Sequence, residues 1–409
     1  MTTTINNEHK QLNVPNLRFP EFEGEWEKCA LENLSTEIGD GIHATPLYDD
    51  NETYYFVNGN NISEYGITIT PTTQRVTEAE AYRNNANILC SKTILLSING
   101  TIGNVALYKG EPIMLGKSAC YINVSTKVNK HYIFHYLMMP KCQFYFTSEL
   151  TGTTIKNLSL KSVRRTKVSL PNLKEQNRIA QLFDAINERI VTQNKIIDKL
   201  QSLIKGLNDT LYAQHGDEVM TSFAELGTSY SGLSGKSAQD FGSGKPFITY
   251  LNVYSNNVIN ENDFQYVAIK DGEKQNIVEY GDVLFTLSSE TPNEVGIGSV
   301  YLGKEKVYLN SFCFGIHITN TKVAFSPYLS YYVSSTAFRK FVYPYAQGST
   351  RFNLCKVDFE KASIKLPTLG HQKRIYSILS HLDCKMETEI QMLNLYNSQK
   401  QYLLRQMFI

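Results

Sequence analysis

The chain contains an internal repeat, and this repeat constrains its fold more than any other feature. A shift of 196 residues aligns Gly152–Thr154 with Gly348–Thr350. Nearer the start of each copy the shift falls to about 191, where Phe56-Val57 aligns with Phe247-Ile248. The copies therefore differ by small insertions. A chain of 409 residues has room for about two to four domains. We predict an alternation in which a globular unit and a shared segment are each present twice.

The shared segments carry apolar residues spaced alternately by four and three, the pattern of a coiled coil. Nine of ten seam residues are apolar in the first copy and eight of ten in the second. They are Ile179, Phe183, Ile186, Ile190, Gln193, Ile197, Leu200, Ile204, Leu207 and Leu211, then Ile375, Leu379, Leu382, Met386, Glu389, Leu393, Tyr396, Lys400, Leu403 and Met407. Pro171 and Pro367 stand where each helix can begin. An amphipathic helix that packs against its own domain is the alternative.

Between these segments the pattern changes to short apolar runs and polar, glycine-rich loops. Strands are predicted at Tyr54–Val57, Thr93–Ile98, Val105–Tyr108 and Asp282–Leu287, and helices at Tyr132–Met138 and Tyr328–Phe341. The predicted class is α+β. Two homologous α/β units are separated by a pair of long antiparallel coiled-coil helices with pseudo-two-fold symmetry.

Charge is segregated in the same order in both copies. The net charge is −10 over residues 1–80 and +10 over residues 81–170. It is −8 over residues 217–300 and +6 over residues 301–365. A basic region in each of two units favours a polyanion bound at two points, because neutralised phosphates release counterions. Solvated surface or a protein partner would also explain a charge run.

The composition excludes several protein classes. A hydrophobic content of 42% and an aromatic content of 11% argue against disorder. The sequence holds no run of 18 apolar residues, and its start is polar, so neither a membrane span nor a secretory signal is predicted. Seven cysteines without a C-x-x-C spacing argue against a disulfide framework and a cysteine zinc site. We expect a cytoplasmic protein.

The sequence gives no catalytic motif. Gly235–Ser237 ends like a phosphate-binding loop but lacks the first glycine. The Asp/Glu-x-Lys triplets Glu8–Lys10 and Asp383–Lys385 fall in the polar start and in a predicted coiled coil. His131 and His135 are four residues apart on a predicted helix, without a third ligand nearby in the sequence, and are interpreted as ordinary helix residues. We predict neither a catalytic residue nor a metal site.

Five segments together resemble one family. The run Leu170–Ile179, which opens a long predicted helix after a basic unit, resembles the conserved region of type I restriction–modification specificity subunits. Pro15–Phe22 and Gly24–Glu27, at the opening of the chain, also resemble the conserved region of that family, and Gly100–Gly103 and Gly152–Thr153 are similar to its target-recognition domains. The resemblance covers nearly the whole chain.

The resemblance implies a non-catalytic DNA-recognition subunit. Each head would read one half of a bipartite double-stranded DNA target, and the helices would fix the gap. Two methyltransferase subunits would dock on the chain, and restriction subunits would join them. The chain itself would need no cofactor, with S-adenosylmethionine, ATP and Mg expected on the partner subunits. The implied domains are target-recognition domain 1 at 1–170, spacer helix 1 at 171–215, target-recognition domain 2 at 216–365 and spacer helix 2 at 366–409.

Candidate contact residues come from composition, since Asn and Gln can pair with adenine edges and Arg with guanine. Candidates for base contacts are Asn58, Asn60, Asn61, Asn99, Thr101 and Lys117 in the first unit and Asn252, Ser288, Asn293 and Arg339 in the second. Candidates for phosphate contacts are Lys156, Lys161, Arg164, Arg165, Arg351 and Lys356. Any single one of the polar loop residues is also an ordinary turn residue.

Subunit docking is predicted at Glu175, Gln176 and Gln372. The second copy departs from the first, because His371 stands where the first copy has Glu175, and Trp26 has no counterpart. If docking uses that glutamate, the second docking site is the weaker one. Two other functional classes stay open from the residues alone. They are a two-headed protein scaffold without sequence-specific DNA binding and, less favoured, a self-sufficient nuclease.

Overall fold

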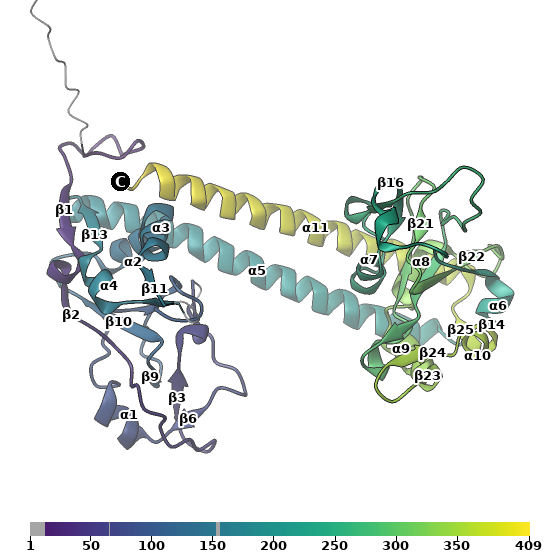
Figure 1. Cartoon of the computed structure of the whole chain (residues 1–409), viewed down its shortest axis with the longest axis horizontal. Helices are drawn as coiled ribbons and strands as arrows, with labels where there is room; N and C mark the ends of the chain where they lie inside the picture. Colours follow the sequence, from purple (N-terminus) through teal and green to yellow (C-terminus); the bar gives the residue numbers. More distant parts are fainter. Residues whose placement is uncertain (1–12, 65, 153–155) are drawn as a thin grey trace, which may run out of the picture. The chain divides into compact units, whose positions relative to one another are not determined.

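The computed structural model describes residues 13–64, 66–152 and 156–409. It contains two compact units, one made of residues up to 195 together with 390–409, the other of residues 196–389. The two longest helices, α5 (Leu173–His215) and α11 (Leu369–Gln406), each contribute one half to each unit (Figure 1). Thr153 and Thr154 of the repeat motif and the triplet Glu8–Lys10 lie outside the described residues.

The first unit is built on a four-stranded antiparallel sheet with the order β2-β10-β7-β8. The central strand β10 places Ile122 between Ile38 of β2 and Ile94 of β7. A three-stranded sheet with the order β6-β3-β9 contains a parallel pair, β3 with β9. The strands of this unit are β1 (Glu27–Ala30), β2 (Ser35–Asp40), β3 (Tyr54–Val57), β4 (Ile62–Ser63), β5 (Gly66–Ile67), β6 (Arg75–Val76), β7 (Thr93–Ser97), β8 (Val105–Leu107), β9 (Ile113–Leu115), β10 (Ala119–Val124), β11 (Leu150–Thr151), β12 (Asn157–Leu158) and β13 (Lys167–Leu170).

The second unit repeats this plan. Its four-stranded antiparallel sheet has the order β15-β22-β18-β20, and its sheet β17-β16-β21 again contains one parallel pair, β16 with β21. The strands are β14 (Val219–Ser222), β15 (Gly227–Ser231), β16 (Phe241–Ile248), β17 (Gln265–Val267), β18 (Val283–Thr286), β19 (Ser288–Ser289), β20 (Gly298–Val300), β21 (Tyr308–Leu309), β22 (Cys313–Ile318), β23 (Ala346–Gln347), β24 (Phe352–Leu354) and β25 (Ser363–Leu366). The predicted duplication and the α+β class are confirmed.

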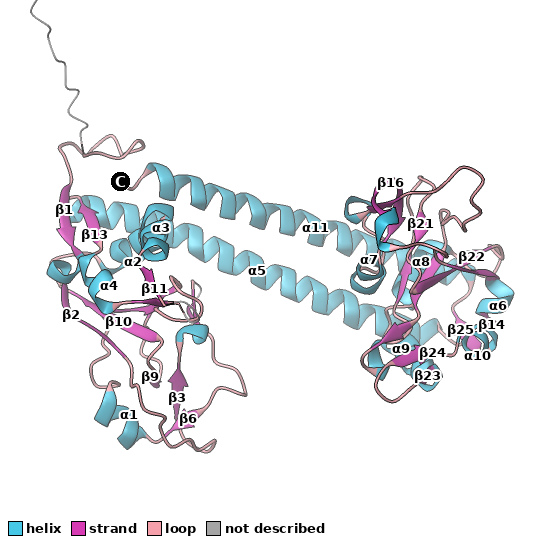
Figure 2. Ribbon diagram, in the orientation of Figure 1, coloured by secondary structure: helices cyan, strands magenta, loops and turns pink. Residues whose placement is uncertain are grey.

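Short helices and turns complete both units (Figure 2). In the first unit these are η1 (Leu31–Leu34), η2 (Gly59–Asn61), α1 (Glu78–Asn84), α2 (Lys130–Met138), α3 (Pro140–Ser148) and α4 (Leu160–Arg165). In the second they are α6 (Phe223–Leu226), η3 (Ala238–Asp240), α7 (Tyr250–Ser255), η4 (Glu261–Asp263), η5 (Pro292–Glu294), α8 (Ser326–Tyr332), α9 (Thr336–Val342), η6 (Tyr343–Tyr345) and α10 (Lys356–Lys361). The single helix predicted at Tyr328–Phe341 is wrong. It is two helices, because the Ser335 side chain accepts a hydrogen bond from the N–H of Phe338 and starts α9.

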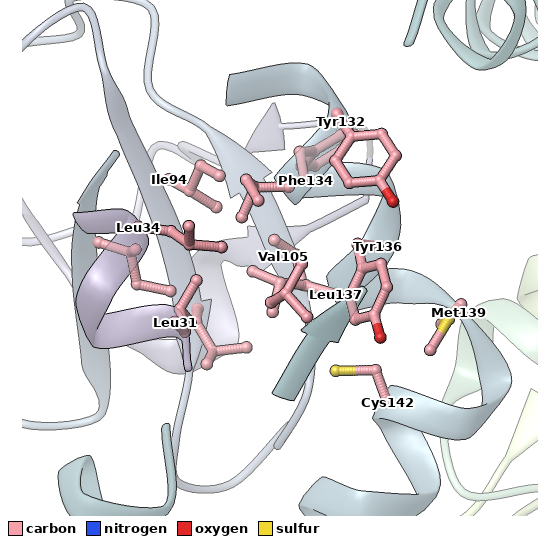
Figure 3. Close-up of a cluster of buried hydrophobic side chains, with 14 of the residues drawn as sticks. Leu31, Leu34, Ile94, Val105, Tyr132, Phe134, Tyr136, Leu137, Met139 and Cys142 are labelled. Carbon is pink, nitrogen blue, oxygen red and sulfur yellow. The ribbon is translucent and has the colours of Figure 1, made fainter. Parts of the chain in front are cut away.

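The core of the first unit joins α2 to the four-stranded sheet. In Figure 3, Tyr132, Phe134, Tyr136 and Leu137 of α2 lie among side chains from β7, β8 and η1. The start of α5, the end of α11 and the residues that follow it belong to the same core, where the ring centroids of Phe183 and Phe408 are 5.4 Å apart. Burial of such apolar surface contributes about 25 cal/mol per Å² and is the main force that holds each head on its helices.

Within each unit, the part of α5 and the part of α11 therefore pack against each other in antiparallel orientation. In the second unit the end of α5, through Leu207 and Leu211, shares a core with Ile375 and Leu379 at the start of α11. All twenty predicted seam residues are buried or half-buried. The seam was predicted correctly because a heptad pattern on a long helix reports burial directly.

Candidate nucleic-acid interface

Three loops of the first unit meet at one edge, which we call the first loop cluster (residues 58–61, 99–104 and 116–118). The parallel pair of β3 and β9 brings Asn58 beside Gly116, and the Ser118 hydroxyl donates to Asn58 Oδ1 over 2.9 Å. The Thr101 hydroxyl donates to the carbonyl of Gly59 over 2.8 Å. Four of the six base-contact candidates lie half-buried or exposed on two of these loops as Asn58, Asn60, Asn61 and Asn99. Thr101 and Lys117 are exposed on the same cluster.

The turn after β7 requires glycine at two positions. Gly100 has φ +74° and Gly103 has φ +91°, values that L side chains rarely adopt. Asn99 also forms an isolated antiparallel bridge with Asn157. This bridge brings the backbone beside Lys156 to the first loop cluster. Lys156 is a phosphate-contact candidate and lies 57 residues after Asn99 in the sequence.

The second unit carries an equivalent arrangement, the second loop cluster (residues 249–254, 288–297 and 310–313). Ser288 pairs with Asn353, the repeat counterpart of Asn157, and the guanidinium of Arg351 donates to the Ser288 hydroxyl over 3.2 Å. The hydroxyl of Tyr250 donates to the Ser288 carbonyl over 2.8 Å. The guanidinium carbon of Arg351 lies 5.9 Å from the centre of the exposed ring of Phe312. Of the candidates, Ser288, Asn293 and Arg351 are thereby brought to one cluster.

Some predicted contact residues in both units have their side chains occupied inside the unit. In the first unit Asn61 accepts from the N–H of Asn58 and donates to the carbonyl of Thr68, each over 3.0 Å, and in the second Ser288 is 5% exposed. Two further residues of the second unit, Asn252 and Arg339, are also engaged. Asn252 is 3% exposed, donates to the carbonyl of Asn260 and accepts from the N–H of the same residue. Arg339 donates to the carbonyls of Asn293, Val295 and Gly296 over 2.6–2.9 Å. Burial lowers the pKa of Arg339. These two residues hold the turns of the second loop cluster, and a base contact from either stays a prediction.

Arg339 has a counterpart that sequence reasoning missed. Gln143 occupies the same repeat position and donates to the carbonyl of Gly103 over 2.9 Å, as Arg339 donates to that of Gly296 over 2.8 Å. In both units a side chain from the second helix after the sheet thus holds the glycine-containing loop. The signal was present, because a shift of 196 aligns the two positions.

The phosphate-contact candidates of the first unit are all on the surface. Lys156, Lys161, Arg164 and Arg165 are exposed, the last three on α4. Arg164 also donates to the carbonyl of Ile38 over 2.7 Å, which leaves its other nitrogens for a partner. In the second unit Arg351 is exposed, whereas Lys356 is half-buried and lies 3.6 Å from the carboxylate of Glu360.

The docking candidates are buried at the starts of the long helices. Gln176 donates to the carbonyl of Pro171 and accepts from the N–H of Asn129. Gln372 repeats both contacts with Pro367 and Phe325. Each glutamine therefore joins the start of its helix to the loop before α2 or α8. A contact of either with another subunit stays a prediction.

Glu175 is fully buried and forms a two-bonded ion pair with Arg18, over 2.7 and 2.8 Å. A partner would have to compete with this pair to reach the carboxylate. Its role in docking also stays a prediction.

A second polar contact joins each head to its long helix. His131 Nδ1 and His135 Nε2 each lie 2.8 Å from the carboxylate of Asp184 on α5. Burial lowers the pKa of His135, which is 0% exposed. Burial alone would raise the pKa of Asp184, but the hydrogen bonds from the two histidines outweigh it and hold that pKa well below its usual range. In the second unit Tyr331, the repeat counterpart of His135, donates to Asp383 of α11.

The comparisons with known proteins agree with this architecture. The family model described as "Type I restriction modification DNA specificity domain" matches residues 23–202 and again 231–395. The chain belongs to this family. It is a specificity subunit of a type I restriction–modification system, with two specificity domains. Because such subunits supply recognition rather than chemistry, the family assigns this chain no catalytic role. No helix among the described residues has the length and apolar character needed to cross a membrane.

Individual relatives are similar over most of the chain or over a shorter segment of it. A putative type I restriction enzyme MjaX specificity subunit from Methanocaldococcus jannaschii is 23% identical over 93% of this chain and 92% of its own length. A putative specificity subunit from Haemophilus influenzae is 32% identical over 22% of this chain and 23% of its own. The crystal structure of a type I system S subunit from M. genitalium covers 97% of this chain and 99% of its own, with 16% identity and a TM-score of 0.58. That likeness supports the fold.

Proposed function

We propose that each unit reads one half of a bipartite DNA target through its loop cluster. The observation that carries this proposal is the repetition of one construction in both units. In each unit the polar loop after a central strand pairs with an asparagine, Asn157 or Asn353. The same loop is held by the side chain of Gln143 in the first unit and of Arg339 in the second, which occupy the same repeat position. Side-chain amides and hydroxyls on such an edge can read base edges in the major groove.

The exposed basic residues supply the affinity in this proposal. Lys156, Lys161, Arg164 and Arg165 would contact phosphates beside the first loop cluster, and Arg351 beside the second. Such contacts position a protein on the duplex, whereas the loops specify the sequence. The long helices would fix the gap between the half-sites.

The partners complete the proposed activity. Two methyltransferase subunits dock on the chain through the region of Glu175, Gln176 and Gln372, and restriction subunits join them. These partners carry S-adenosylmethionine, ATP and Mg, and the chain itself carries no catalytic cofactor. The proposed location is the cytoplasm, which fits a subunit of a type I restriction–modification system.

A methylome tests the proposal. The chain is expressed with its methyltransferase partner in a methylation-free host, and modified adenines are mapped at single-base resolution. We expect one split motif that disappears when this chain is omitted. An Asn60→Asp variant should alter one half of the motif only, and an Asn293→Asp variant, at an exposed base-contact candidate of the second loop cluster, the other half only. An exposed lysine on α5, changed in Lys199→Ala, is the control and should leave both halves unchanged.

The outcomes separate the functional classes. A motif that does not depend on this chain, with the partner intact and present, would contradict DNA specificity and favour the two-headed scaffold. Cleavage of DNA by the purified chain alone would instead favour the self-sufficient nuclease. Binding that ignores duplex sequence but falls steeply with salt would contradict readout by the loop clusters and leave only phosphate contact.

A further inference from the structure

The second unit gathers two imidazoles and a carboxylate at one point of its surface. His215 ends α5, Glu218 precedes β14, and His371 lies in the first turn of α11. A carboxylate oxygen of Glu218 lies 2.8 Å from His371 Nδ1 and 3.3 Å from His215 Nδ1. The donor atoms of the three residues all lie within 4.8 Å of one another. Among the described residues this is the one group of three or more His, Cys, Asp or Glu side chains that is so closely gathered.

The backbone fixes all three donors. Antiparallel pairing of Val219 with Leu366 brings the residue before β14 beside the start of α11. The N–H of Thr368 donates to Glu218 over 2.7 Å and orients its carboxylate. The rings of His215 and His371 lie with centroids 4.0 Å apart and planes tilted by 31°, and both place Nδ1 near the carboxylate of Glu218. A small adjustment would bring the donors to the spacing of about 3.3 Å that tetrahedral zinc bonds of about 2.0 Å require.

The equivalent position of the first unit also holds a carboxylate, and there a cation is paired with it. There the residue at the repeat position of His371 is Glu175, and its charge is neutralised by the guanidinium of Arg18. The strand registers place Trp26 where the second unit has Glu218. The second unit thus has imidazoles where the first has a guanidinium, and a bound cation would place a permanent positive charge beside its carboxylate.

We propose that His215, Glu218 and His371 form a binding site for a divalent transition-metal ion, with zinc as the preferred natural occupant. Two imidazoles and one carboxylate suit zinc, whereas calcium and magnesium prefer oxygen ligands alone. The side chains are 27–34% exposed, which leaves room for a water molecule as the fourth ligand. The ion would tie the end of α5 to the start of α11 within the second unit. This site does not depend on the proposed DNA readout.

The test is a metal titration of the full chain after removal of bound metal with a chelator. Zn²⁺ binding is followed by calorimetry, and Co²⁺ binding by its visible absorption, which reports a four-coordinate nitrogen–oxygen environment. We expect one ion per chain. His371→Gln and His215→Ala should each weaken binding by more than about 100-fold, the upper end of what loss of a mere supporting contact costs. Glu218→Gln should weaken it as well. His381→Ala is the matched control, since His381 is exposed on the same helix α11, and it should bind like the wild type.

Stability supplies a readout that needs no variant. A ligand that binds the folded state raises the melting temperature by mass action, so Zn²⁺ should raise that of the wild-type second unit. Unchanged Zn²⁺ affinity in the His215→Ala/His371→Gln double variant would overturn the proposal. So would a wild-type chain that shows neither Co²⁺ absorption nor a rise in melting temperature, whether or not the variants fold.

Discussion

The first unit fixes the start of its long helix with an arginine–glutamate ion pair, whereas the second places a histidine and a glutamate there. Arg18 and Glu175 meet in a buried, two-bonded pair, and Glu218 and His371 meet near the surface. Beside them Gln176 and Gln372 make the same two backbone contacts. Both units therefore share the glutamine contacts but differ in the charged groups beside them. This difference predicts different responses of the two units to mutation, pH and salt.

The largest expected effect is the loss of the Arg18–Glu175 pair. Arg18→Met leaves a fully buried carboxylate without its partner, and we expect the free energy of unfolding of the first unit to fall by about 3–5 kcal/mol. Glu218→Gln should cost the second unit far less, because its carboxylate is solvent-accessible. Urea unfolding followed by fluorescence measures the first unit selectively, since the single tryptophan, Trp26, is 3% exposed in its core.

The double variant Arg18→Met/Glu175→Met is the control for this experiment. Because it removes both charges, it should recover most of the stability that the single variant loses. A double variant as unstable as Arg18→Met would show that the loss comes from packing around Arg18 and not from an unpaired carboxylate.

A smaller effect is expected from the residues that hold the glycine-containing loops. Arg339→Met leaves three carbonyls without their donor, and each unsatisfied buried group costs about 1–3 kcal/mol where water cannot replace the donor. We expect faster hydrogen exchange at residues 293–296 and a lower unfolding midpoint by circular dichroism. Lys340→Ala, which removes an exposed side chain of the same helix α9, should leave both measurements unchanged. Equal effects of the two substitutions would contradict the internal role of Arg339.

Arg339 also shows where sequence reasoning reaches its limit. The seam of α5 and α11 and the duplicated strands were predictable, because their periodic patterns report burial within a short window. An arginine or asparagine on a polar loop has no such pattern. The side chain of Asn252 donates a hydrogen bond to Asn260 in the structure, yet an asparagine on a polar loop fits a base contact equally well.

The contacts that assemble the loop clusters are also non-local. Asn58 meets Ser118 across 60 residues through a parallel strand pair, and Asn99 meets Asn157 across a similar span. A single sequence gives no pairing register for such strands. The repeat predicts where the docking candidates lie in the chain, but it does not predict their burial. A glutamate near the start of a helix is usually exposed, and Glu175 is buried because Arg18 pairs with it.

The contact of His131 and His135 with Asp184 in the first unit and that of Tyr331 with Asp383 in the second predict opposite effects of acid on the stability of the two units. The pKa values of His135 and Asp184 are both lowered in the folded first unit, so the unfolded chain binds protons first as the pH falls. The first unit should therefore lose stability below about pH 6.5, by at most about 1.4 kcal/mol per pH unit for His135. Burial raises the pKa of both Tyr331 and Asp383, so the second unit has no corresponding loss from this contact.

Urea midpoints read through Trp26 at pH 7.5 and pH 5.5 measure this effect. His135→Tyr, which copies the residue of the second unit, should flatten the pH dependence of the first unit. A wild-type midpoint that stays constant between the two pH values would contradict the assignment of a neutral, buried His135.

The smallest expected effect concerns phosphate contacts, where the units differ in local charge. Lys161 lies on α4 among basic neighbours, whereas Lys356 is already paired with Glu360 over 3.6 Å. Each phosphate contact adds about 0.9 to the slope of log binding constant against log salt concentration. Lys161→Ala should therefore reduce the slope by about 0.9, and Lys356→Ala should reduce it by less, because its charge is partly neutralised before DNA arrives. Binding of the assembled chain and methyltransferase to a duplex at several salt concentrations gives both slopes, with Lys199→Ala as the unchanged reference. Equal reductions at Lys161 and Lys356 would contradict this difference and show that the carboxylate of Glu360 moves away on binding.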